Sequence, residues 1–229
     1  MELPRATTEV DAELLAPLLA ELAAEPCGHS WRTLLAELAG APSAELVDQL
    51  LARAQRFRPF TLFTWVAEGQ AVAIGTVAER VHATFPHEGF PVIARCFVRR
   101  PWRGRGLYPH LVRQRIAHCH ERWGDQLRAV HLGAADKPVL ATVRQLEPAF
   151  VHVGDETLHV AGEAWRVRDY LAPTPRFRAE LPDEPILRRF LDEGAAAVTY
   201  TELHAALGER SEPALRQLFD LLDAIGVQR

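Results

Sequence analysis

The apolar positions near the middle of the chain change from strand spacing to helix spacing on either side of an arginine- and glycine-rich turn. Residues 92–98 form a short run rich in β-branched and aromatic side chains, which is typical of a buried strand. Pro101 has no N–H to donate to a sheet and should end that strand. From Leu107 to Trp123 the apolar residues recur at helical spacing, and Gly124 follows as a helix stop. The pattern predicts a strand, a tight turn and a helix.

Helical spacing also covers the N-terminal quarter of the chain. Residues 8–25 predict a helix capped by Thr8, and serines at the starts of residues 30–39 and 43–55 predict two more helices. We expect the three to form a helical N-terminal part over residues 1–56. This part either lines an acceptor pocket or simply packs against a sheet.

Strand spacing dominates the next part of the chain. Residues 60–67 and 71–81 predict a hairpin whose turn is Glu68-Gly69-Gln70. Gly75, inside the second of these strands, predicts a bulge or a close approach of another backbone. Residues 127–133 predict a short buried strand after the central helix. A strand–helix–strand unit of this length predicts a parallel pair with a right-handed crossover.

The last part of the chain first continues the sheet and then becomes helical. Residues 137–146 predict a short helix, and residues 149–153 and 158–170 predict two strands joined by Gly154-Asp155-Glu156. A proline-rich stretch that begins at Pro173 predicts a linker. Three further helices are predicted at residues 185–193, 200–207 and 213–225.

Composition allows one full domain and a small second one. The chain has 229 residues, of which 48% are hydrophobic, and a net charge of −4. We expect a main domain at residues 1–172, a linker at 173–182 and a helical C-terminal module at 183–229. The spacing of the module resembles a helix-turn-helix, but from Arg176 onward seven arginines stand against ten acidic residues. A DNA-binding protein would carry a basic stripe, so we expect homodimerisation, or packing over an acceptor site, rather than nucleic-acid binding.

Three features bear on the compartment. No apolar segment is long enough to span a membrane. Residues 1–12 are charged and lack the apolar core of a signal peptide. Cys27, Cys96 and Cys119 are odd in number and widely spaced, which indicates a reducing environment rather than a disulfide framework. We expect a cytoplasmic protein with no membrane partner.

The turn before the central helix has the features of an anion site. The first turn of a helix has backbone N–H groups without internal partners and a partial positive charge. Gly104 and Gly106 have no Cβ, so a ligand can approach the backbone closely. The side chains of Arg99, Arg100, Arg103 and Arg105 add formal positive charge. A pyrophosphate is the natural occupant, and the alternative is a solvated basic loop.

The same residues resemble a known family signature. Arg103-Gly104-Arg105-Gly106-Leu107-Tyr108 resembles the Arg/Gln-x-x-Gly-x-Gly/Ala motif of the GNAT superfamily of acyl-CoA-dependent N-acyltransferases. Tyr108 stands where that family has a small residue, and it could equally be a packing residue. The resemblance implies an α+β fold in which helices flank a mixed sheet of about six to seven strands. It further implies that residues 103–108 hold the CoA pyrophosphate, while Cys96, Phe97 and Val98 hold the pantetheine arm in a gap between two parallel strands.

The resemblance implies transfer of an acyl group, most simply acetyl, from acyl-CoA to a primary amine by direct attack in a ternary complex. The amine must lose a proton to a base, and a backbone N–H on the diverging strand can stabilise the oxyanion. No carboxylate lies within residues 92–98, where many family members have one. The candidate bases are therefore the loop residues His82, His87 and Glu88, and His131 on the second strand. Each could instead be an ordinary loop residue or, for His131, a satisfied half-buried histidine.

Other functions remain open at this stage. The chain also lacks a counterpart of the tyrosine that commonly acts as general acid in the family, because its tyrosines are Tyr108, Tyr170 and Tyr200. A catalytically degenerate acyl-CoA sensor or scaffold is the first alternative, and a DNA-binding regulator with an acidic helical tail is the second. We expect no metal, because adjacent residues of a helix such as His118, Cys119 and His120 point in different directions. The acceptor amine, small molecule or peptide, cannot be identified from the sequence.

Overall fold

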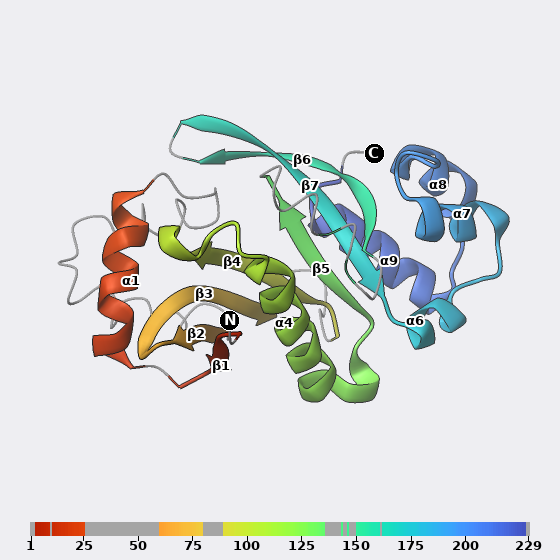
Figure 1. The fold of residues 1–229 in the computed structure, drawn as a ribbon. Coiled ribbons are helices and arrows are strands. Elements are labelled where there is room, and N and C mark those ends of the chain that lie inside the picture. Colours follow the sequence, from red (N-terminus) through yellow and green to blue (C-terminus); the bar gives the residue numbers. More distant parts are fainter. Residues whose placement is uncertain are drawn as a thin grey trace.

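A mixed β-sheet organises the part of the chain that the computed structural model describes, namely residues 3–9, 11–25, 60–79, 89–135, 143, 146, 150–160 and 162–227. Within these residues, seven strands form one sheet in the order β1-β2-β3-β4-β5-β7-β6 (Figure 1). The strands are β1 (Arg5–Thr7), β2 (Phe60–Ala67), β3 (Gln70–Glu79), β4 (Pro91–Val98), β5 (Ala129–Ala134), β6 (Val151–Val160) and β7 (Glu163–Pro173). The expected α+β fold with a mixed sheet is confirmed.

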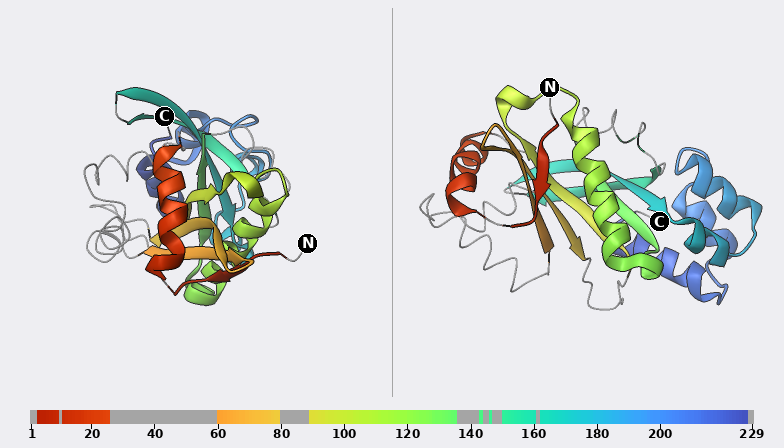
Figure 2. Two further views of the ribbon diagram at one scale, coloured as in Figure 1. Left: turned by 60° about the vertical axis from the view of Figure 1, so that its left-hand side comes forward. Right: turned by 60° about the horizontal axis from the view of Figure 1, so that its bottom comes forward.

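Helices flank this sheet. They are α1 (Ala12–Ala24), α4 (Leu107–Trp123), α6 (Pro175–Glu180), α7 (Pro185–Glu193), α8 (Tyr200–Leu207) and α9 (Pro213–Ala224), with short 3-10 turns at Arg100–Trp102 and Gly124–Gln126. Figure 2 shows α4 and the C-terminal helices from two further directions. Within the described residues, no helix is both long enough and apolar enough to cross a membrane.

The pairing of the strands agrees with the predicted connections. β4 and β5 are parallel, as expected for a strand–α4–strand unit, and the other neighbouring pairs are antiparallel. The hairpin of β2 and β3 turns at Glu68 and Gly69, which have φ angles of 52° and 71°. Positive φ at both central residues matches the right-handed twist of the strands.

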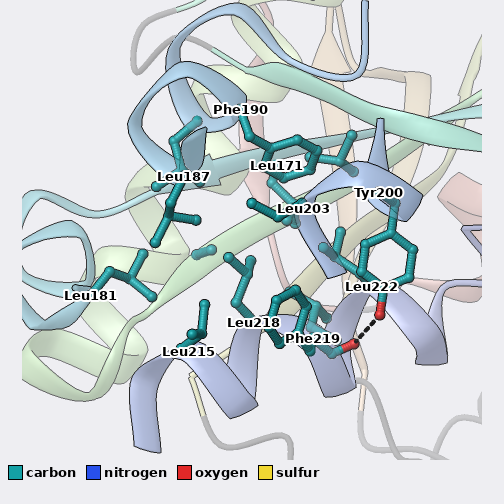
Figure 3. Close-up of a cluster of buried hydrophobic side chains, with 14 of the residues drawn as sticks. Leu171, Leu181, Leu187, Phe190, Tyr200, Leu203, Leu215, Leu218, Phe219 and Leu222 are labelled. Atoms are coloured by element: carbon teal, nitrogen blue, oxygen red, sulfur yellow. Dashed lines mark hydrogen bonds between the residues drawn. The ribbon is translucent and has the colours of Figure 1, made fainter. Parts of the chain in front are cut away.

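Different helices pack against the two faces of the sheet. On one face, residues such as Trp65, Ile93 and Leu132 pack with Leu111 and Val112 of α4. On the other face, residues of β5, β6 and β7 join the core of the C-terminal helices. Figure 3 shows Leu171 of β7 among leucine and phenylalanine side chains of that core. Alternate residues of β5 therefore lie in different cores, because side chains of a strand alternate between the faces of its sheet.

The N-terminal prediction needs correction. Residues 5–7 form β1, which was not predicted and which pairs with β2. The helix expected at 8–25 is shorter, and its cap is Asp11, whose carboxylate accepts the Leu14 N–H at 3.1 Å, not Thr8. The helices expected at 30–39 and 43–55, and all of 137–146 except the buried Val143 and Leu146, lie outside the described residues.

The predicted turn at Gly154-Asp155-Glu156 is wrong. These residues lie inside β6, at a register shift opposite Asp169, and the hairpin turns near Gly162 instead. Gly154 has a packing role, because a Cβ added there would lie 2.4 Å from Cγ1 of Val227. The glycine lets the end of the chain lie directly on the strand.

The three C-terminal helices begin at the predicted residues. α7, α8 and α9 start at Pro185, Tyr200 and Pro213, and a capping box of Thr199 and Glu202 begins α8. The stretch expected to be a linker contains α6, whose Phe177 is completely buried. The division of the chain into two domains stays a prediction.

Candidate functional site

The glycine-rich loop lies at the start of α4, as predicted. Gly106 is the N-cap residue of the helix in a left-handed conformation, with φ of 72°, and Gly104 has φ of 73°. No side chain caps this end, and no acidic residue lies in the first turn. The N–H groups of such an uncapped turn are available to an anion.

The space in front of both glycines is open. A Cβ added at Gly104 or Gly106 would meet nothing within 4 Å. The glycines are therefore required by their positive φ rather than by close packing. Tyr108, the departure from the family motif, packs partly buried against the α4 core.

The arginines of the loop do not all contribute free positive charge. Arg99 Nε donates to Glu21 Oε2 at 2.7 Å, and Arg103 Nη2 lies 2.5 Å from Glu25 Oε2. Arg103 also donates to the Val98 carbonyl at 2.7 Å and lies over the Phe97 ring. These contacts attach the loop to the end of α1. Because Arg99 and Arg103 are paired with carboxylates, they leave less positive charge for an anion than the sequence alone indicates.

Glu21 holds the loop with both carboxylate oxygens. Besides its contact with Arg99, it accepts the backbone N–H of Arg100 at 2.7 Å. Burial alone would raise the pKa of Glu21, but the hydrogen bonds from Arg99 and from the Arg100 N–H outweigh it and lower the pKa below 4.5. Neither Glu21 nor Glu25 was identified from the sequence. Their spacing of one helical turn was visible, but their partners are about 78 residues away.

The expected divergence of two parallel strands is present. β4 and β5 pair only at Val92–His131 and Ile93–Leu132. β4 remains paired with β3 as far as Val98, and β5 remains paired with β7 as far as Ala134. The two strands therefore diverge beyond these pairs, as Figure 1 shows. Cys96, Phe97 and Val98 lie on the diverging part of β4.

A bulge interrupts β4 at the start of the divergence. Ile74 of β3 pairs with Phe97 and Thr76 pairs with Ala94, so Gly75 faces both Arg95 and Cys96. Arg95 has φ of 51°, which is uncommon for a residue other than glycine. Strained residues of this kind gather at functional sites. Gly75, predicted to mark a bulge or a close approach, lies opposite it.

His131 forms a buried pair with Asp169. Its Nε2 lies 2.7 Å from Oδ1 of Asp169, and the two side chains are 4% and 0% exposed. Asp169 belongs to β7 and lies opposite Gly133. Sequence reasoning found His131 but missed Asp169, although an aspartate directly before the apolar residues Tyr170, Leu171 and Ala172 was a usable signal. The other candidate bases, His82, His87 and Glu88, lie outside the described residues.

Burial disfavours the reactive form of both described thiols, and Tyr170 and Tyr200 have partners of their own. Burial raises the pKa of the Cys96 thiol, although Arg115 opposes the shift, and burial raises that of Cys119 to about 12. The Tyr170 ring lies 5.4 Å from that of His152. The Tyr200 hydroxyl donates to Asp223 at 2.8 Å within the C-terminal helices.

Comparison with known proteins identifies the fold. No protein-family model matches the sequence, and no curated protein matches it. A ribosomal-protein-alanine N-acetyltransferase from Brucella melitensis superposes with a TM-score of 0.55 at 17% identity, covering 74% of this chain and 99% of its own. An N-acetyltransferase from Staphylococcus aureus gives a TM-score of 0.54 at 14% identity, with coverages of 74% and 98%. A GNAT-family acetyltransferase from Streptococcus pneumoniae gives 0.51 at 14%, with coverages of 72% and 94%. The chain has the GNAT fold.

Proposed function

We propose that this protein is an N-acyltransferase that moves an acyl group, most simply acetyl, from acyl-CoA to a primary amine. The observation that carries the proposal is the divergence of β4 from β5 directly before an uncapped, glycine-started helix. A strand with an unpaired edge and a helix N-terminus at its end suit a ligand that is a peptide-like arm joined to a diphosphate.

The diphosphate and the pantetheine arm of acyl-CoA would each find partners in this arrangement. Backbone N–H groups of residues 103–108 would hold the pyrophosphate at the positive end of α4. The open edge of Cys96, Phe97 and Val98 would pair with the amides of pantetheine, as an added strand does. When bound, acyl-CoA supplies an activated thioester, and this arrangement would bring it to the bulge at Arg95.

The reaction is an addition followed by an elimination. The amine nitrogen attacks the thioester carbon and forms a C–N bond, and the carbonyl oxygen becomes an oxyanion that backbone N–H groups of the bulge stabilise. Collapse of this intermediate breaks the C–S bond, and the CoA thiolate leaves and takes up a proton. The proton lost by the amine goes to a base. We assign this role to His131, oriented by Asp169, or to the loop residues His82, His87 and Glu88.

Two structural neighbours support an amine as acceptor. The Brucella protein is described as a ribosomal-protein-alanine N-acetyltransferase, and another match as a spermidine N-acetyltransferase chimera from Vibrio cholerae and hSSAT. Their acceptors differ widely in size, so the fold alone does not select one.

Cys96 and Cys119 are both free, which supports a reducing compartment such as the cytoplasm.

An acyl-CoA sensor without turnover is the second candidate. The observation that favours it is the burial of His131, together with the absence of a carboxylate from β4. Such a protein would bind acyl-CoA between the same two strands. Binding would change the surface of the protein, but the acyl group would not be transferred.

Calorimetry with acetyl-CoA and a matched pair of glycine variants tests the proposal. Gly106→Val should weaken binding about tenfold or more, because it adds a side chain at a left-handed position where the diphosphate would lie. Gly124→Val is the control, since Gly124 also has positive φ and open surroundings but lies at the far end of α4. Failure of the wild type to bind millimolar acetyl-CoA would contradict the proposal. Release of CoA thiol with members of an amine panel would select the enzyme over the sensor.

A further inference from the structure

Arg115 of α4 is a buried cation without a carboxylate partner. Its side chain is completely buried, and no ion pair joins it to an acidic residue in the part of the chain that the structure describes. Its Nη2 is also buried and has no hydrogen-bond partner among the described residues. A buried charge of this kind costs several kcal/mol unless it is compensated, so its presence calls for a reason.

The remaining contacts of Arg115 converge on the bulge of β4. Its Nη1 donates to the Ala94 carbonyl at 3.1 Å and more weakly to the Thr76 carbonyl at 3.5 Å. Its Nε donates to the Leu111 carbonyl of its own helix at 3.2 Å, and its guanidinium lies over the Trp65 ring. The hydroxyl of Thr76 also donates to the Ala94 carbonyl, at 3.2 Å. Ala94 O thus accepts two donors from side chains.

A glycine in the neighbouring strand makes room for this arrangement. A Cβ added at Gly75 would lie 3.0 Å from Nη1 of Arg115 and 3.2 Å from the Trp65 ring. Gly75 has an ordinary negative φ and faces the bulge. The strand therefore has no side chain at the point where the guanidinium reaches the sheet.

The Ala94 carbonyl matters because of its peptide group. The same peptide contains the N–H of Arg95, the left-handed residue at which β4 starts to leave β5. Donation to a carbonyl polarises its peptide and strengthens the attached N–H as a donor. A cation at that carbonyl adds to the effect, because the low dielectric of the interior does not screen it.

We propose that Arg115 is a positioning residue for acyl transfer, which holds the β4 bulge through the Ala94 carbonyl and makes the main chain at Arg95 a stronger donor to the thioester oxygen. The inference rests on the proposed function. Arg115 contacts main-chain carbonyls and the Trp65 ring, so it is not assigned a contact with the reacting atoms. Its effect on the reaction passes through the peptide that it polarises.

The test compares Arg115→Met, which keeps an unbranched side chain but removes the guanidinium group and its charge, with Arg115→Lys. Removal of the buried charge offsets the loss of its hydrogen bonds to carbonyl groups, so Arg115→Met should unfold at about the same temperature as the wild type. Its kcat should fall about tenfold to a hundredfold, less than on removal of a direct oxyanion donor, while its affinity for acetyl-CoA stays within about threefold. Arg115→Lys should recover part of the loss. Arg113→Met, on an exposed position of the same helix, is the control and should change neither quantity.

An infrared measurement does not depend on turnover. The carbonyl stretch of bound ¹³C-labelled acetyl-CoA should lie at lower frequency in the wild type than in Arg115→Met, because the stronger donor polarises the thioester. Equal frequencies and equal kcat, or a loss of kcat that accompanies a lower unfolding temperature, would overturn the role of Arg115. Absence of acetyl-CoA binding by the wild type would instead overturn the proposed function, so the two failures are distinguishable.

Discussion

Glu21 links the end of α1 to the loop that precedes α4. Its two oxygens accept Arg99 Nε and the Arg100 N–H, each at 2.7 Å, and the neighbouring Glu25 holds Arg103. Arg99 and Arg103 are therefore held in ion pairs with carboxylates and do not act as unpaired positive charges. These contacts attach the loop between β4 and α4, and with it Gly104 and Gly106, to α1.

Glu21→Gln should lower the free energy of unfolding by about 1–2 kcal/mol at neutral pH, since hydrogen bonds to charged groups are worth about 1.5–3 kcal/mol and this site is partly solvated. The pKa of Glu21 is lowered from 4.5. The carboxylate therefore stabilises the fold fully above pH 4.5, and the stabilisation is lost as the pH falls through the lowered pKa. Urea unfolding of both proteins in a descending pH series measures the difference, which should shrink to near zero in acid.

Glu13→Gln is the control for this series, because Glu13 is exposed on the same helix. Its effect should be the smaller of the two. A difference between wild type and Glu21→Gln that persists undiminished in acid would show that the charge of Glu21 does not hold the loop.

Asp169 and Arg115 are two residues whose partners could not be predicted from the sequence. Each is a charged residue in an otherwise apolar pattern, so a buried polar contact could be suspected. The partner could not be named, because His131 and Ala94 come into reach only through the pairing of β5 with β7 and the packing of α4 on β4. Long-range pairing is not encoded in spacing along the chain.

Individual elements were predictable where local signals are strong. α4 begins after Gly106 and ends before Gly124, and prolines at the first position start α7 and α9. β1 has only three residues and exists through its pairing with β2. In β6, glycine at position 154 was interpreted as a turn because turns and close contacts both favour glycine.

Gly154→Ala should destabilise the protein by about 1–3 kcal/mol, the usual cost of an added methyl group in a filled space. The added Cβ would collide with Val227 Cγ1, at 2.4 Å. Val227→Ala removes that atom, so the double variant should be more stable than the sum of the single changes predicts. Chemical unfolding of the four proteins gives the coupling energy. Additive effects would mean that the end of the chain does not pack on β6.

At the scale of the whole molecule, the sheet and the C-terminal helices share one core. Phe90, Ala129, Val153 and Leu171 come from the sheet side and pack in the same cluster as Leu187, Leu203 and Leu222 of the helices. The sequence pattern of residues 185–225 predicted three helices, and the charge balance from Arg176 onward predicted the lack of basic charge, but neither predicted this cover of the sheet. The surface that a helix covers depends on which strands lie beneath it. A shared core favours joint unfolding of the two parts, whereas a boundary after residue 173 would favour separate transitions.

Leu222→Ala distinguishes these outcomes. Leu222 is completely buried in the shared core, so its truncation should cost about 2–5 kcal/mol. All five tryptophans, at residues 31, 65, 102, 123 and 165, precede the C-terminal helices and report on the rest of the chain. The fluorescence midpoint in urea should therefore fall together with the midpoint from circular dichroism, while Arg216→Ala, on an exposed position of α9, leaves both in place. A fall in the dichroism midpoint with unchanged fluorescence would instead establish the C-terminal helices as an independent unit.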